Sequence, residues 1–273
     1  MVTSQCANNV PFALAVTDAL NDAQTGLDTV PQVLPTFTPP AGGVPVVVDT
    51  DESTGFKVTL DQLDRALTPR TKVLLFVSPD NPSGAIYSPE EVEAIGRWAV
   101  EHGIWVITDE IYEHLVFGDH RFTSMPTLVP ELADTCIVLN GVAKTYAMTG
   151  WRVGYIHGPS RLIEEMTKLQ QYTFVCAPSM AQHGALEALS LDMTPIVDSY
   201  RHKRDYMRGR LEKYYDIGPP GGAFYIYPRA PRGMKGSDFV AQAIANNLLI
   251  IPGNVFSASD THFRLSYAVA DHQ

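Results

Sequence analysis

A lysine and an arginine, Lys144 and Arg152, stand eight residues apart directly after the apolar run Cys136-Ile137-Val138-Leu139. A lysine amine can condense with an aldehyde, and a guanidinium can hold a phosphate through two parallel hydrogen bonds. Gly150 and Gly154 flank the arginine and allow the backbone to approach a neighbour closely. On local sequence alone, Lys144 is equally compatible with a solvated loop lysine. An arginine beside a strand is commonly paired with a surface acid, an interpretation that this glycine-flanked position favours less for Arg152.

Three polar residues follow short apolar runs that are typical of parallel strands. They are Asn81 after Val73–Val77, Asp109 after Ile104–Thr108 and Lys144 after Ile137–Leu139. Ligands of open parallel sheets bind in the crevice outside the carboxyl ends of the strands. We therefore expect these three side chains to meet in one crevice.

Asp109 ends a strongly apolar run and opens the segment Asp109-Glu110-Ile111-Tyr112. A carboxylate in apolar surroundings is costly unless it has a cationic or hydrogen-bonding partner. A partner bound in the crevice is one interpretation of this residue. The alternative is a capping role at the start of the turn that follows.

The elements that must position these residues alternate short apolar runs with helical patterns. This alternation predicts an α/β fold, a mainly parallel sheet with helices on both faces. The capping boxes Thr59–Gln62 and Ser88–Glu91 each predict the start of a helix of roughly three to four turns. Strands are predicted at 44–48, 73–77, 104–107, 137–139 and 153–156, and further helices near 160–173, 179–190 and 195–213. The last helix is rich in charge, which indicates a solvated face or a bridge between two domains.

From Gly221 onward the chain is predicted to form a small α+β unit. Its strands are expected at Ala223–Tyr227, Leu248–Ile251 and Phe263–Tyr267, with a helix near Ser237–Asn246. We expect a large domain in residues 1–192 and a small C-terminal domain in residues 193–273. Arg264 alternates with apolar residues in the last strand, so spacing alone predicts that it faces outward.

Composition narrows the class of protein. The 273 residues carry 20 Lys and Arg against 30 Asp and Glu, a net charge of −10, which argues against nucleic acid as a partner. The three cysteines lack metal-ligand spacing, so we expect no metal site and a reducing, cytoplasmic location. No stretch is long and apolar enough to span a bilayer, and the first 20 residues lack the pattern of a signal peptide.

Taken together, these residues resemble the signature set of the fold-type I pyridoxal-phosphate enzymes, specifically the aspartate and aromatic aminotransferases. Ser78–Gly84, Asp109–Tyr112 and Asn140–Tyr155 carry the resemblance, which extends from about Ala41 to the C-terminus. It implies pyridoxal 5′-phosphate (PLP) as cofactor, the large domain of the PLP-dependent transferases, and a homodimer with its active sites at the subunit interface.

The resemblance also implies a role for each candidate residue. Lys144 binds the cofactor aldehyde and then moves the proton between the substrate Cα and the cofactor. Asp109 keeps the pyridine nitrogen protonated, so that the ring accepts electrons. Tyr112 and Asn81 hydrogen-bond the phenolic oxygen of the cofactor. Arg152 binds its phosphate.

Further expectations concern the substrate and the N-terminal part of the chain. By resemblance, Arg264 clamps the α-carboxylate of the substrate, and the motif Gly221–Tyr225 is structural. Family subunits are longer than this chain, which implies that most of the N-terminal arm and first helices and a final helix are missing. The phosphate-cradling turn is expected near residues 1–8, with Gln5 at the place of the usual glycine. Phe37 is the candidate for stacking on the pyridine ring, and an amphipathic helix is predicted over 12–23.

The first hypothesis is therefore transamination between an amino acid and a 2-oxo acid by a ping-pong mechanism. Aspartate or glutamate is the expected donor, with aromatic amino acids as another. The first alternative keeps the cofactor but changes the reaction, to β-elimination or racemisation, because one scaffold hosts several chemistries. The second alternative is a shortened, non-catalytic relative.

Overall fold

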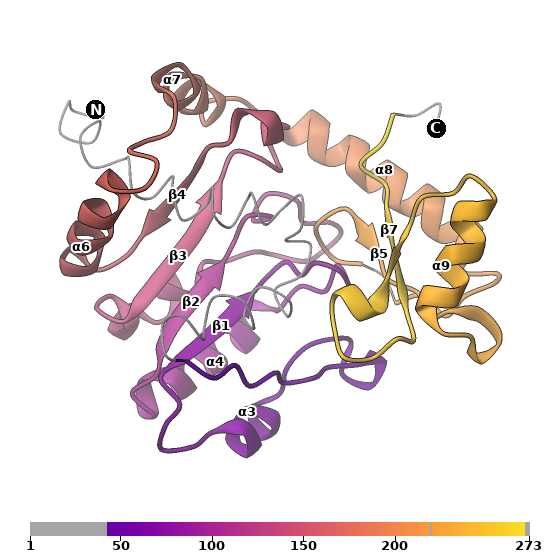
Figure 1. The fold of residues 1–273 in the computed structure, drawn as a ribbon, viewed down its shortest axis with the longest axis horizontal. Helices are drawn as coiled ribbons and strands as arrows, with labels where there is room; N and C mark the ends of the chain where they lie inside the picture. The colour runs from indigo at the N-terminus through magenta and orange to yellow at the C-terminus, as the bar shows by residue number, and fades with distance from the viewer. Residues whose placement is uncertain (1–42, 219, 271–273) are drawn as a thin grey trace.

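The computed structural model describes residues 43–218 and 220–270. Its larger sheet has four strands in the order β1-β2-β3-β4 (Figure 1). They are β1 (Val73–Val77), β2 (Trp105–Asp109), β3 (Cys136–Gly141) and β4 (Gly154–His157). The first three run parallel, and β4 pairs antiparallel with β3. The predicted α/β fold with a mainly parallel sheet is confirmed, and four of its five predicted strands lie within a residue or two of the observed ones.

The antiparallel direction of β4 follows from the link that precedes it. A parallel return needs a long crossover, usually a helix, whereas this link contains only the 3-10 turn η5 (Thr149–Trp151). The same short link carries Lys144 and Arg152, so both residues stay close to the carboxyl end of β3.

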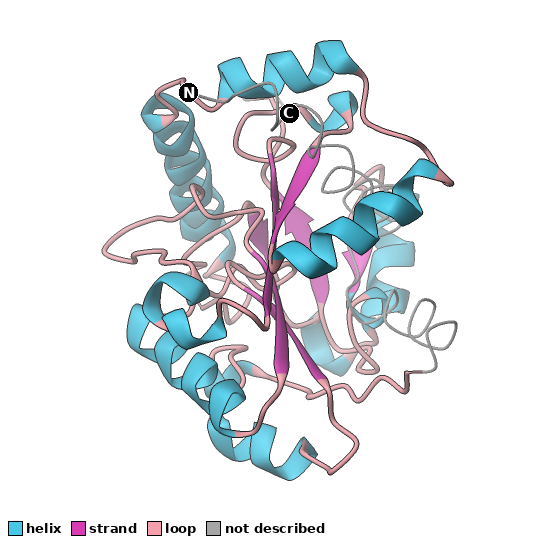
Figure 2. Cartoon of the chain, turned by 90° about the vertical axis from the view of Figure 1, so that its left-hand side faces the viewer, coloured by secondary structure: helices cyan, strands magenta, loops and turns pink. Residues whose placement is uncertain are grey.

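Helices cover both faces of the sheet (Figure 2). On one face, Val106 and Val138 pack in a buried cluster with residues of α4 (Pro89–Glu101). On the other, Leu139 and Ile156 pack against α6 (Ser160–Gln171). Alternate residues of each strand therefore meet different helices, which explains why the strands are apolar almost throughout.

Both predicted capping boxes are present. In α4, the backbone N–H of Ser88 donates to the Glu91 carboxylate at 2.7 Å, and the Glu91 N–H donates to the Ser88 hydroxyl at 3.3 Å. The helix after the first box, α3 (Leu60–Ala66), has seven residues, about two turns, so its predicted length was wrong. Leu67 is already extended, and Pro69 two residues on disfavours helical backbone before it.

The remaining helices before the C-terminal unit include two that match the predictions near 179–190 and 195–213 and two short ones, at 125–128 and 130–132, that the sequence did not predict. They are α5 (Met125–Leu128), η4 (Pro130–Leu132), α7 (Ser179–Ala188) and α8 (Thr194–Leu211). The predicted strand at 44–48 was wrong, because within the described residues this segment pairs with no strand and Val44 is 82% exposed. In residues 43–218 and 220–270, no helix combines the length and apolar character needed to cross a bilayer.

The C-terminal unit has a three-stranded antiparallel sheet in the order β5-β7-β6. Its elements are β5 (Tyr225–Ile226), η6 (Pro231–Gly233), α9 (Gly236–Ala245), β6 (Ile251–Pro252), η7 (Gly253–Val255) and β7 (Phe263–Ser266). Val240 of α9 packs with Phe263 of β7 in its core.

A second apolar cluster joins this unit to the larger one. Leu115 and Phe117, from the loop after β2, pack with Phe224 and Tyr267, and Tyr200 of α8 packs against them. The charged helix α8 therefore lies against both units, as the bridging interpretation expected.

A polar contact joins the two units at another point. The Glu52 carboxylate, in η3 (Glu52–Thr54), lies 2.7 Å from the Arg229 guanidinium and 2.7 Å from Nε2 of His262. The His262 ring stacks on Tyr227, with centroids 4.9 Å apart. The segment around Glu52 is thereby fastened to the strand that carries Arg264.

Candidate functional site

Asp109 lies at the carboxyl end of β2, where the strand turns into a loop. Its Oδ1 accepts a hydrogen bond from the backbone N–H of Ile111 at 3.1 Å. Burial raises the pKa of Asp109 from 3.8 to about 6, although the Ile111 amide and the positive charge of Lys144 both act to lower it. A carboxylate so poorly solvated has much to gain from a further cationic partner. The hydrogen bond from the Ile111 N–H also fits the capping alternative. Asp109 therefore does both: it caps the turn that follows β2, and it lies within the influence of the Lys144 charge.

Tyr112 follows in the same turn and is 3% exposed. The Lys144 Nζ lies 5.8 Å from the centre of its ring. The Tyr112 hydroxyl lies 3.0 Å from the hydroxyl of Tyr225, which comes from β5 of the C-terminal unit. Tyr112 therefore connects the lysine with the smaller sheet.

Lys144 sits in the loop after β3, and its neighbours hold that loop in place. Val142, Ala143 and Thr145 are almost fully buried, and the Thr149 hydroxyl donates to the Ala143 carbonyl at 2.7 Å. The lysine itself is only partly exposed. The backbone on both sides of Lys144 is therefore packed, whereas a solvated loop lysine has exposed neighbours.

Arg152 ends η5 with left-handed backbone, at φ 56° and ψ 49°. Its Nη1 donates to the Thr149 carbonyl at 3.3 Å, which holds the side chain over the same turn. Gly141 and Gly154 face each other in the β3–β4 ladder, where a Cβ on Gly141 would lie 2.9 Å from the Gly154 Cα. The close approach expected of Gly154 is therefore present. A Cβ on Gly150 would meet open space, so that glycine serves no such contact.

Arg264 is 6% exposed, so the outward-facing position predicted from its spacing was wrong. Its Nη1 donates to Oδ1 of Asn81 at 2.7 Å. Its guanidinium carbon lies 4.3 Å from the ring centre of Tyr225 and 4.8 Å from that of Phe256. Arg264 is enclosed because Asn81, from the loop after β1, and the rings of Tyr225 and Phe256 cover its face of the small sheet.

The structure thus brings five of the six predicted site residues into one chain of contacts. The charge of Lys144 lowers the pKa of Asp109, and the Lys144 amine lies beside the Tyr112 ring. Asn81 accepts a hydrogen bond from Arg264. Tyr225 joins the two halves of this chain. The sequence analysis did not single out Tyr225, because its motif Gly221–Tyr225 indicated only a turn into a strand. The sixth residue, Arg152, lies in the loop that carries Lys144.

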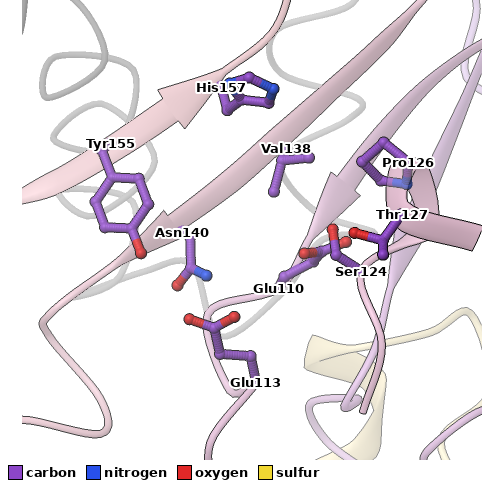
Figure 3. A pocket seen from close by; sticks show the side chains of 9 residues that line it. All are labelled: Glu110, Glu113, Ser124, Pro126, Thr127, Val138, Asn140, Tyr155 and His157. Atoms are coloured by element: carbon purple, nitrogen blue, oxygen red, sulfur yellow. The ribbon is translucent and has the colours of Figure 1, made fainter. Parts of the chain in front are cut away.

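A separate polar pocket of about 380 Å³ opens on the other face of the larger sheet. Figure 3 shows Glu110, Asn140 and Tyr155 around it. Glu110 follows Asp109 along an extended backbone, and side chains alternate between the faces of a sheet, so the two carboxylates point to opposite sides. The lining of this pocket includes none of the six predicted residues. Among the described residues, no group of three or more histidine, cysteine, aspartate or glutamate side chains is arranged to hold a metal ion.

The expectations for Gln5, Phe37 and the helix at 12–23 lie outside the described residues.

Known structures share this architecture. The aromatic aminotransferase of Pyrococcus horikoshii superposes with a TM-score of 0.81 at 35% identity, over 84% of this chain and 64% of that one. The aspartate aminotransferase of Thermus thermophilus with maleate gives 0.77 at 35% identity, over 85% of this chain and 62% of that one. The fold is therefore that of the PLP-dependent aminotransferases.

Sequence comparison identifies the family. Residues 40–273 match the profile of the family Aminotransferase class I and II, and the chain belongs to that family. It is 48% identical over 248 residues to the aspartate aminotransferase of Streptomyces avermitilis, a match that covers 85% of this chain. The chain spans about 60% of the length of that relative. The resemblance stated from the sequence is confirmed.

Proposed function

We propose that this protein binds PLP through Lys144 and transfers an amino group between an amino acid and a 2-oxo acid. One observation carries the proposal: the Asp109 carboxylate, whose pKa is raised by burial, lies within the influence of the Lys144 amine, and that amine lies 5.8 Å from the centre of the Tyr112 ring. A carboxylate, an amine and a phenol linked in this way match the three polar functions of a pyridoxal ring, which are its nitrogen, its aldehyde and its phenolic oxygen.

The donor set fits the cofactor on the chemistry of each residue. Asp109 gains a cationic partner from a protonated pyridine nitrogen, which offsets the cost of burying the carboxylate. Tyr112 and Asn81 offer a hydroxyl and an amide to the phenolic oxygen. Arg152 provides the guanidinium that suits a phosphate. When bound, PLP supplies an electron sink for the pair left behind by a proton on the substrate Cα.

The protein's own residues then account for the remaining steps. With the cofactor bound, the Lys144 amine would be the base that takes the proton from the substrate Cα and returns it. Arg264 binds the substrate α-carboxylate with two parallel hydrogen bonds and so fixes the orientation of Cα. A 2-oxo acid leaves before the acceptor enters, which is the ping-pong order.

The substrates belong to the proposal. We infer that aspartate or glutamate is the donor and 2-oxoglutarate or oxaloacetate the acceptor, with aromatic amino acids as further donors. The relatives support both classes, because they include an aspartate aminotransferase and an aromatic aminotransferase. The proposal also includes the organisation of the protein. We propose a large domain in residues 1–192, a small domain in residues 193–273, assembly as a homodimer and a cytoplasmic location.

An absorption spectrum tests the proposal. The protein is titrated with PLP, and the spectrum is recorded before and after the addition of aspartate. We expect a visible band from the lysine-bound cofactor that aspartate converts to a near-ultraviolet band, and no visible band in Lys144→Ala. Lys168→Ala is the matched control, because Lys168 is an exposed helical lysine paired with Glu165.

Each other result has a definite meaning. Absence of the visible band in the unchanged protein would refute the proposal and favour the non-catalytic alternative. Release of pyruvate and ammonia from β-chloroalanine, without amino transfer to 2-oxoglutarate, would favour β-elimination. An unaltered band in Lys144→Ala would exclude this lysine as the attachment point.

A further inference from the structure

Tyr225 lies between the two halves of the candidate site and contacts both. Its side chain is 3% exposed and belongs to β5, which pairs with the strand that carries Arg264 (Figure 1). One face of its ring lies 4.3 Å from the Arg264 guanidinium carbon, and its hydroxyl lies 3.0 Å from the Tyr112 hydroxyl.

The ring of Tyr225 restricts the guanidinium. A cation over an aromatic face is attracted by the negative potential of that face, and a planar guanidinium stacks on it. Phe256 lies 4.8 Å from the same guanidinium carbon, and Asn81 accepts a hydrogen bond from Nη1. These contacts define the plane of the guanidinium, and that plane decides whether two parallel hydrogen bonds reach a carboxylate.

The hydroxyl of Tyr225 contacts Tyr112, in the half of the site that contains Lys144. A phenol that accepts one hydrogen bond becomes a stronger donor in the next, because the bonds polarise one another. When Tyr112 donates to a ligand oxygen, the Tyr225 hydroxyl is placed to donate to the Tyr112 oxygen. The hydroxyl thus orients Tyr112 and strengthens its donation at once.

We propose that Tyr225 is a positioning residue that couples the carboxylate clamp, Arg264, to the cofactor-facing phenol, Tyr112. The inference rests on the proposed function. The ring of Tyr225 contacts Arg264 and its hydroxyl contacts Tyr112, so two substitutions separate the two contributions. Tyr225→Phe removes the hydroxyl and keeps the ring, and Tyr225→Leu removes both.

The test uses the PLP-loaded protein with two readouts. The first is the dissociation constant of maleate, a dicarboxylate that reports on the clamp. The second is the pKa of the visible absorption band, which reports on how well Tyr112 stabilises the unprotonated form of the bound cofactor. For Tyr225→Phe we expect maleate affinity within about twofold of the unchanged protein and a band pKa higher by about half a unit or more. For Tyr225→Leu we expect maleate affinity about tenfold weaker and the same rise in band pKa.

Tyr267→Phe is the matched control. Tyr267 is 2% exposed, lies just beyond β7 and donates its hydroxyl to the Ala223 carbonyl, so its loss perturbs the same core. We expect it to leave both readouts unchanged.

Two results would overturn the inference while the proposed function stands. One is a visible band in the unchanged protein together with Tyr225 variants that match it in both readouts. The other is equal changes in Tyr225→Phe and Tyr267→Phe, which would indicate general loosening of the core. Absence of the visible band in the unchanged protein would instead overturn the proposed function, and the inference with it.

Discussion

Replacement of Asp109 by asparagine tests how burial acts on the candidate site. The carboxylate ends β2 and accepts one hydrogen bond, from the backbone N–H of Ile111. An asparagine side chain is of similar size and keeps an oxygen for that bond, but it carries no charge to desolvate. We therefore expect Asp109→Asn to make the ligand-free protein more stable near neutral pH.

The magnitude follows from the pKa of Asp109, which burial raises from 3.8 to about 6. Because the folded-state pKa is the higher one, the folded protein binds more protons than the unfolded chain between about pH 4 and pH 6. The free energy of unfolding therefore falls as pH rises through this window, and the full penalty applies above it. At about 1.4 kcal/mol per pH unit, the penalty is at most about 3 kcal/mol. Asp109 keeps some solvent contact, so we expect a gain of about 1 to 2 kcal/mol.

Urea unfolding of the ligand-free protein at pH 7.5 and pH 5 measures this gain. We expect the advantage of Asp109→Asn at pH 5 to be about half its value at pH 7.5, because at pH 5 most of the folded protein already has Asp109 protonated while the unfolded chain does not. Asp134→Asn, at an exposed position in the loop before β3, is the control and should show no such gain. A variant that is less stable than the unchanged protein at pH 7.5, or a gain independent of pH, would refute the reasoning. If the proposed function holds, the same substitution weakens PLP binding, so stability and function change in opposite directions.

Three further predictions concern the scaffold. Ser88→Ala removes the cap of α4 and should lower the free energy of unfolding by about 1 kcal/mol in urea, and an unchanged midpoint would contradict the capping role. Leu115→Ala opens a cavity in the cluster between the two units and should cost about 2 to 5 kcal/mol by the same assay, with a loss below 1 kcal/mol as the contrary result. Burial lowers the pKa of His262 despite the nearby Glu52, so its contribution to stability is present above about pH 6.5 and falls as pH decreases below it. His262→Gln should flatten that part of the pH profile relative to the unchanged protein, and an identical slope would exclude His262 as its source.

Local sequence predicted most of the fold because the relevant signals are local. The Ser88 capping box satisfies the first amides of α4 with residues three positions apart, so neighbours along the chain are sufficient to mark the start of that helix. The apolar runs of β2 and β3 pack against residues on both faces of the sheet, which leaves an unbroken pattern in the sequence. The segment at 44–48 has the same composition, but a strand also needs a partner, and composition does not provide one.

The sequence by itself determined which residue types stand at the ends of the strands: Asn81, Asp109 and Lys144 all follow apolar runs of the larger sheet. Topology alone then brings them to one edge, because parallel strands end on the same side. Only the tertiary structure decided the direction of Arg264, since alternation along a strand does not tell which face another unit covers. It also decided the part played by Tyr225, which contacts both Arg264 and Tyr112, the latter more than a hundred residues earlier in the chain. Contacts over such separations depend on how the two units pack, and that packing is a property of the whole fold.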